Sequence, residues 1–148
     1  MTGNHLRIAY WCHMLLAPAL IPSSMAWADT PVDVGTSVRI ESAVATPGNA
    51  GGRSSIRFKL INDSSSSLHL LGLVTPVAEQ AELVARTGPD KASRLQSITI
   101  SKESVLDLTT SHLRFEVDGL LRALIPGEEF PMTLRFVGFS VPVVVHVH

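Results

Sequence analysis

The chain has 148 residues, of which 45% are hydrophobic and 17% are charged, and its formal net charge at pH 7 is −1. A chain of this length forms one domain of ordinary size. The near-balance of charges, without a basic stripe, argues against a nucleic-acid-binding protein.

The first 28 residues have the pattern of a secretory signal peptide. Arg7 precedes a mostly apolar stretch, and Ala26 and Ala28 have the small-x-small spacing that signal peptidase recognises. We therefore expect export to the periplasm and cleavage after Ala28, which leaves a domain over residues 29–148. A retained membrane anchor is the alternative, but the apolar stretch is short and is interrupted by prolines. No later apolar run is long enough to span a membrane.

Cleavage would change the inventory of side chains that bind metals or form disulfides. Cys12, the one cysteine, would leave with the leader, so no disulfide could form even in an oxidising compartment. Losing Arg7 from the 12 Lys and Arg leaves 11 against 13 Asp and Glu, a net charge of −2. Met132 would be the one methionine that remains.

The rest of the chain consists of short segments with strand patterns, separated by turns rich in Gly, Pro and Ser. We predict strands over residues 37–45, 54–62, 68–74, 81–86, 94–100, 104–108, 112–117, 130–137 and 141–148. Segment 119–130 is ambiguous, because one helical turn could precede the turn at Pro126 and Gly127. Short strands at regular spacing predict an all-β fold, an antiparallel β-sandwich or β-barrel.

Alternation of apolar and polar residues predicts which side chains of each strand face the core. In segment 54–62 the expected inward set is Ile56, Phe58 and Leu60. In segment 37–45 one face is expected to carry Val38, Ile40 and Ser42.

Segment 112–117 raises a functional question. Its apolar face is expected to carry Leu113, Phe115 and Val117, and its other face His112, Arg114 and Glu116. His112 is either a metal ligand or an ordinary polar residue on a solvated face.

The sequence has no recognisable enzyme signature. There is no GxSxG, HExxH or P-loop motif, so we predict that the chain is not an enzyme. The GNAGG stretch at 48–52 precedes a predicted strand rather than a helix, and we interpret it as a hairpin loop and not a phosphate-binding loop. Asn62, Asp63 and Ser64 fit a glycosylation sequon, although a turn of this composition also explains them.

Three further histidines fall in predicted strands. His69 lies between two leucines of segment 68–74, and we expect it to point outward. His146 and His148 are two residues apart and share one side of the last strand, where two imidazoles could hold Cu(II) or Zn(II) weakly. A solvated, fraying strand end without metal is the alternative, and we favour it.

Four stretches taken in order resemble the PCu(A)C family of periplasmic copper(I) chaperones. They are VRIESAVATPGNAGGRSSIRFKLIND (38–63), LHLLGLVTPVAEQAELV (68–84), HLRFEVDGLLRALIPGEEFPMTLRF (112–136) and VPVVVHV (141–147). The third is similar to the family pattern H-x-M followed by G-L and L-x-x-G-x-x-x-P-x-T-L-x-F. The resemblance implies a cupredoxin-like β-barrel, copper(I) as cargo and an acceptor protein in the periplasm.

The family binds Cu(I) through His and Met side chains, because this soft ion prefers imidazole and thioether donors. Carried over by resemblance, the family's positions fall on Val84, Arg86, Leu95, His112 and Arg114, so His112 is the one ligand type retained. Arginine stays protonated in proteins, and its charge would repel a bound cation. We therefore expect a degenerate copper(I) site.

Two functional hypotheses remain open at this point. In the first, the protein is a copper chaperone that passes its metal to an acceptor. In the second, it is a metal-free interaction module in which Arg86, Arg114 and His112 form a cationic patch for an acidic partner or a small anion. Convergence of the two arginines near His112 would favour the second hypothesis. A solvated ion pair between Arg114 and Glu116 would instead contribute little.

Overall fold

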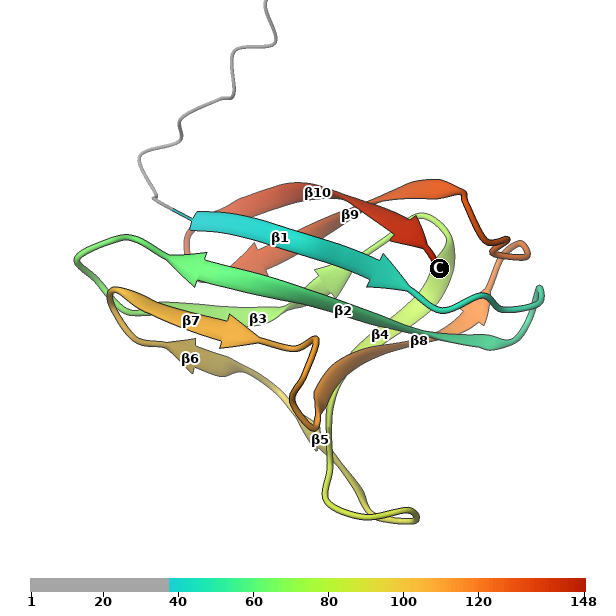
Figure 1. Cartoon of the computed structure of the whole chain (residues 1–148), viewed down its shortest axis with the longest axis horizontal. Helices are drawn as coiled ribbons and strands as arrows, with labels where there is room; N and C mark the ends of the chain where they lie inside the picture. Colours follow the sequence, from blue (N-terminus) through green and yellow to red (C-terminus); the bar gives the residue numbers. More distant parts are fainter. Residues whose placement is uncertain (1–37) are drawn as a thin grey trace, which may run out of the picture. The chain divides into compact units, whose positions relative to one another are not determined.

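The computed structural model describes residues 38–148, and the expected signal peptide and its cleavage site lie outside the described residues. Residues 38–148 form ten strands and no helix (Figure 1). The strands are β1 (Val38–Ala45), β2 (Arg53–Asn62), β3 (Leu68–Val74), β4 (Ala78–Arg86), β5 (Ala92–Leu95), β6 (Ile98–Ile100), β7 (Ser104–Asp107), β8 (Leu113–Leu120), β9 (Glu129–Phe136) and β10 (Ser140–Val147). This part of the chain thus contains no helix long and apolar enough to cross a membrane.

All ten strands belong to one sheet that curls into a barrel (Figure 1). The strand order is β5-β4-β8-β2-β1-β10-β9-β3-β6, and β7 pairs with β2 away from this path. β1 and β10 run parallel, and the other pairs among these strands are antiparallel. β6 lies beside β7, which brings the β6 end of the strand order next to β2. The predicted all-β, cupredoxin-like barrel is confirmed.

Strand β2 shows how the sequence encloses a core. Its side chains alternate between interior and solvent, and Ile56, Phe58 and Leu60 have no solvent exposure. Phe58 stacks on Phe115 of β8, with 5.8 Å between the ring centroids. Burying one large apolar side chain fully stabilises a fold by roughly 1.5–3 kcal/mol. The predicted inward face of segment 54–62 is therefore confirmed.

Strand β1 departs from the predicted alternation at Ser42. This residue has φ 53°, and the register between β1 and β2 shifts around it. Such a bulge adds one residue to a strand and reverses the direction of the side chains beyond it. Val38 and Ile40 pack against the core, whereas beyond the bulge Ala43 and Ala45 are the buried residues. The prediction that Ser42 shares the inward face is wrong, and its side chain is exposed.

Segment 94–100, predicted as one strand, contributes to two strands. β5 pairs with β4 and β6 pairs with β3, at opposite ends of the strand order. Gln96 and Ser97 connect them outside any strand. The break is set by pairing with distant segments, so local alternation gave no sign of it.

The ambiguous segment between β8 and β9 forms a loop, and the predicted alternative of a helical turn is wrong. Leu124 is buried and makes an isolated antiparallel bridge to Gly48 of the β1–β2 loop. Two backbone hydrogen bonds of 3.2 and 2.8 Å close this bridge. Gly127, after Pro126, has φ 90°, a conformation that glycine adopts without steric cost.

Asn62, the first residue of the possible sequon, has a structural role. Its side chain has no solvent exposure. Its amide nitrogen donates hydrogen bonds to the carbonyls of Ser66 at 2.9 Å, Ser101 at 2.8 Å and Ile100 at 3.3 Å. A buried amide that satisfies the backbone in this way joins the β2–β3 turn to the end of β6. An amide enclosed in the fold leaves no room for a glycan on that nitrogen.

Candidate functional site

Four of the five positions implied by the resemblance come together on the outer face of β4 and β8. Val84 is the register partner of Arg114. The backbone N–H of Arg86 donates to the carbonyl of His112 at 3.0 Å, so these two residues also lie opposite each other. Opposed side chains on one face have Cβ atoms about 5 Å apart. We call these four residues the outer rectangle.

The fifth position, Leu95, lies on the other face of the sheet. It is opposite Leu83, a residue of the core, while its neighbour Arg94 is opposite Val84. Because side chains alternate along a strand, Arg94 belongs to the outer face and Leu95 does not. Nε of Arg94 lies 2.7 Å from Oε2 of Glu82. The structure therefore separates Leu95 from the rectangle and brings a further arginine beside it.

Val84 is buried although it is not part of the barrel's core. Its side chain is 3% exposed, and it lies outside the core cluster. Arg94 and Arg114 are its register partners on the two neighbouring strands. Arginine covers apolar surface with its aliphatic stem while its charged end stays solvated. A valine side chain has no donor atom, so this corner of the rectangle cannot ligate a metal.

The guanidinium groups of Arg86 and Arg114 converge on one carboxylate. Nε and Nη2 of Arg114 lie 2.9 and 2.5 Å from Oε1 of Glu116, and Nη2 of Arg86 lies 3.3 Å from the same oxygen. The side chain of Glu116 is 18% exposed and that of Arg86 is 44% exposed. The hydrogen bond from Arg114, reinforced by the charges of both arginines, holds the pKa of Glu116 below its ordinary value. Glu116 is thus negatively charged between two cations.

A shallow hollow of about 250 Å³ opens beside this ion pair. Its walls are Thr46, Arg53, Ser54, Ser55, Arg86, Arg114 and Glu116. Arg53 forms an ion pair with Asp118. The backbone N–H of Ser55 donates to Oγ1 of Thr46 at 3.0 Å, and Oγ of Ser54 donates to the Thr46 carbonyl at 2.6 Å. These bonds hold in place the side of the hollow that Thr46, Ser54 and Ser55 form. We call the whole hollow the arginine hollow.

The outer face around the hollow has a small positive excess. Four arginines (Arg53, Arg86, Arg94, Arg114) form ion pairs with three carboxylates (Glu82, Glu116, Asp118), a formal balance of +1. The whole chain has a net charge of −1, so the excess is local. His112 is exposed and is not a wall of the hollow. Arg86 and Arg114 therefore converge on Glu116 and not on the imidazole, and the Arg114–Glu116 ion pair is the one that the alternative to the patch hypothesis expected.

The donor chemistry of the described residues does not fit copper(I). Residues 38–148 contain no group of three or more His, Cys, Asp or Glu side chains that could hold a metal ion. Met132 is the one sulfur-bearing residue in this range, and it is 1% exposed within the core. Cu(I) prefers thioether and imidazole donors, and on the outer rectangle the single such group is His112.

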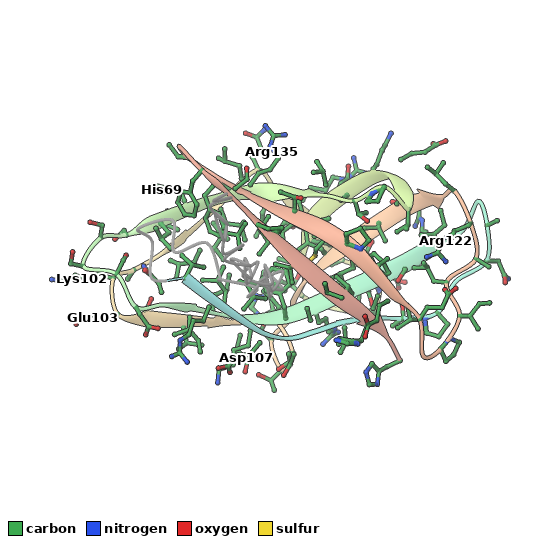
Figure 2. The ribbon with its side chains drawn as sticks, turned by 90° about the horizontal axis from the view of Figure 1, so that it is seen from above. His69, Lys102, Glu103, Asp107, Arg122 and Arg135 are labelled. Atoms are coloured by element: carbon green, nitrogen blue, oxygen red, sulfur yellow. The ribbon has the colours of Figure 1, made fainter. Side chains whose placement is uncertain are left out.

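The other histidines lie apart from this face. Nδ1 of His146 lies 3.1 Å from Oε1 of Glu129, its register partner on β9, and their side chains are 53% and 60% exposed. The backbone N–H of His148 bonds to the end of β1 at 3.0 Å, so the strand end is tied down. Nδ1 of His69 lies 2.9 Å from Oγ1 of Thr99, and its side chain points outward as predicted (Figure 2).

Sequence reasoning missed Arg53 and Arg94 as members of the site. Alternation in β2 places Arg53 on the outward face, so that part of the signal was present. The sequence did not show that β2 pairs with β8 or that β5 pairs with β4, because these pairings depend on contacts between distant segments. A one-residue change of register would also move Arg94 to the other face.

Comparison with known proteins finds no matching family model and no matching curated protein. Solved structures do match. The copper-bound PCuAC domain from PmoF2 has a TM-score of 0.65 and 16% identity, over 75% of this chain and 92% of that one. The apo PCuAC domain from PmoF1 has a TM-score of 0.64 and 12% identity, over 75% and 92%. The Cu(I) form of DR1885 from Deinococcus radiodurans has a TM-score of 0.59 and 24% identity, over 77% and 82%. The chain has a PCuAC-like fold.

Proposed function

We propose that this protein is an exported, non-enzymatic domain related to the copper chaperones, that its copper(I) site is degenerate, and that it acts as a metal-free interaction module in the periplasm. The observation that carries the proposal is the content of the outer rectangle. Its four corners hold one imidazole, one valine and two arginines, on the face where the resemblance puts the metal ligands.

The chemistry of these substitutions opposes metal binding rather than merely weakening it. Two unit charges ~4 Å apart interact by about 4 kcal/mol at an effective dielectric near 20. A copper ion at that distance from Arg86 or Arg114 would meet this repulsion, partly offset by Glu116. The rectangle offers no thioether in compensation.

The same substitutions favour binding of a negatively charged partner. Arginine presents a planar fork of donors that matches a carboxylate, and such charge-assisted bonds are about twice as strong as neutral ones. Arg86 is 44% exposed and Arg53 is 77% exposed, so both reach solvent at the hollow. We infer that an acidic surface of a partner protein docks here.

A competition titration tests the loss of copper. Protein produced from the full-length chain is titrated with Cu(I) against a chromophoric chelator, beside His112→Ala. We expect neither protein to compete. Tight one-to-one binding that His112→Ala abolishes would overturn the proposal and restore the chaperone hypothesis. Recovery of the protein in the periplasmic fraction of expressing cells, without residues 1–28, is the expected result for export.

A further inference from the structure

Next to the arginine hollow lies an apolar surface that the proposed function does not use. It is a second hollow of about 400 Å³, lined by Pro47, Gly48, Asn49, Ala123, Leu124, Ile125 and Pro126. We call it the apolar ledge. Ile125 is 57% exposed, and Leu121, in the same loop, is 61% exposed. Pro47, Ala123 and Pro126 of the same lining are exposed as well. Exposed apolar residues that line one hollow mark a binding surface more often than scattered ones do.

Neighbouring residues of the β1–β2 loop line the two hollows. Thr46 lines the first and Pro47, the next residue, lines the second. Gly48 packs directly against Arg53, since a Cβ at Gly48 would lie 2.6 Å from the Arg53 carbonyl oxygen and 2.7 Å from Cδ1 of Leu120. Glycine is therefore required where the β1–β2 loop crosses β2.

The ledge is ordered by its own hydrogen bonds. The carboxylate of Glu128 accepts from the backbone N–H of Ile125 and from Nη1 of Arg122, both at 2.9 Å. The Gly48–Leu124 bridge holds the other side of the loop against the β1–β2 loop. Figure 2 shows Arg122 at the opposite end of the barrel from Lys102 and Glu103. A surface already fixed in place loses little conformational entropy when it binds a partner.

We propose that the arginine hollow and the apolar ledge together bind one extended segment of a partner protein in which an aspartate or glutamate is adjacent to an apolar side chain. The inference rests on the proposed function and names the chemistry of its partner. The carboxylate would sit against Arg86 and Arg53, and the apolar side chain against Ile125 and Pro47. The local positive charge favours the carboxylate, and the exposed apolar ledge favours the apolar side chain.

Three capped synthetic peptides separate the two halves of the site. One alternates aspartate with leucine, one alternates aspartate with glycine, and one alternates asparagine with leucine. Binding to protein made from the full-length chain is measured at low salt by shifts of backbone amide resonances. We expect the aspartate–leucine peptide to bind about tenfold more tightly than the aspartate–glycine peptide, which corresponds to partial burial of one leucine. We expect no binding of the asparagine–leucine peptide.

Matched variants locate the binding. Arg86→Ala is expected to weaken the aspartate–leucine peptide about tenfold, and Ile125→Ser about fivefold. Arg135→Ala and Val144→Ser make the same chemical changes at exposed positions of β9 and β10, and they should leave binding unchanged. All four residues are exposed, and unchanged circular dichroism would show that each variant folds.

The outcomes distinguish the two proposals. Equal affinity for both aspartate peptides, or no effect of Ile125→Ser, would overturn the composite site and leave the arginine face as the docking surface. Failure of both aspartate peptides, with inorganic phosphate shifting the resonances of the arginine hollow, would replace the protein partner with a small anion and overturn the docking function too. Weaker binding in Arg135→Ala or Val144→Ser would place the partner site elsewhere on the barrel and overturn both proposals.

Discussion

The two faces of strand β8 carry different kinds of side chain. On the inner face, Phe115 and Val117 have no solvent exposure and belong to the core. On the outer face, one residue away along the same strand, Arg114 and Glu116 form an ion pair at the edge of a hollow. The inner face holds the barrel together by apolar packing. The outer face lacks the donors that a copper(I) site requires.

Under the proposed function, this difference would mean that fold and cargo separate along one strand. Because successive side chains point to opposite faces, a substitution at Arg114 need not disturb the packing of Phe115. Core positions tolerate little change in volume, whereas outward positions tolerate changes of charge and size. A barrel of this kind can therefore keep its architecture while its outer rectangle changes from soft metal donors to arginines.

The strongest way to test this separation is to return the family's side chains to the rectangle. Val84→His, Arg86→Met and Arg114→Met, combined with the native His112, would place two imidazoles and two thioethers on one face. Removing two repulsions of about 4 kcal/mol each and adding soft donors should raise Cu(I) affinity by at least about a thousandfold. Competition with a chromophoric chelator measures the gain.

Charge removal alone is the control for that experiment. Arg86→Gln with Arg114→Gln abolishes both guanidiniums without adding sulfur, so its gain in Cu(I) affinity measures the repulsion alone, and the further gain of the first variant measures the soft donors. Equal affinity of the two variants would mean that repulsion alone excludes the metal. No gain in either variant would contradict the equivalence between this rectangle and the family's ligand positions.

The inner face should dominate stability. Phe115→Ala removes a fully buried ring that stacks on Phe58, and it is expected to cost about 3–5 kcal/mol of unfolding free energy. Urea denaturation followed by circular dichroism measures the loss. Arg114→Ala on the neighbouring residue is the matched control and should cost clearly less. A comparable loss in both variants would show that the outer face is part of the structural core after all.

Much of the inner face could be predicted from sequence, because it depends on local alternation. The inward set of β2 and that of β8 follow from apolar residues at every second position. Ser42 was assigned to the wrong face because a bulge adds a residue that the apolar pattern does not reveal. The split of segment 94–100 escaped prediction for a related reason, since both halves satisfy a strand pattern and only their partners differ.

The outer face was predicted less well, because a site on a sheet depends on which strands are neighbours. The resemblance supplied positions 84, 86, 112 and 114, and the structure brings them together. Leu95 was also carried over by resemblance, but pairing with β4 puts it opposite Leu83, and Arg94 is the residue opposite Val84. Arg53 lies far from these positions in sequence, and the pairing of β2 with β8 brings it to the same hollow as Arg86 and Arg114.

Glu116 should have an intermediate effect, because it is the least exposed ionised group of this face. Glu116→Gln leaves two arginines without a counter-charge and should cost about 1–3 kcal/mol. The pKa of Glu116 lies below its ordinary value of 4.5 in the folded protein. Its stabilisation is therefore complete above that value and is lost as the pH falls through the lower folded pKa. Stability measured between pH 7 and pH 2 should fall less steeply in Glu116→Gln than in the native protein, and parallel curves would contradict this assignment.

The smallest expected effect belongs to the ion pair at the edge of the same face. Arg94 and Glu82 are 78% and 30% exposed and 2.7 Å apart, so solvent screens them and their long side chains lose entropy on pairing. Arg94→Ala should change the unfolding free energy by less than about 1 kcal/mol, part of which is the loss of cover over Val84. Arg94→Met retains that cover without the charge, so a difference between the two variants would measure packing rather than electrostatics. A loss as large as that of Glu116→Gln would mean that the arginines of this face act as one network, and the distinction between the less exposed Arg114–Glu116 pair and the more exposed Arg94–Glu82 pair would fail.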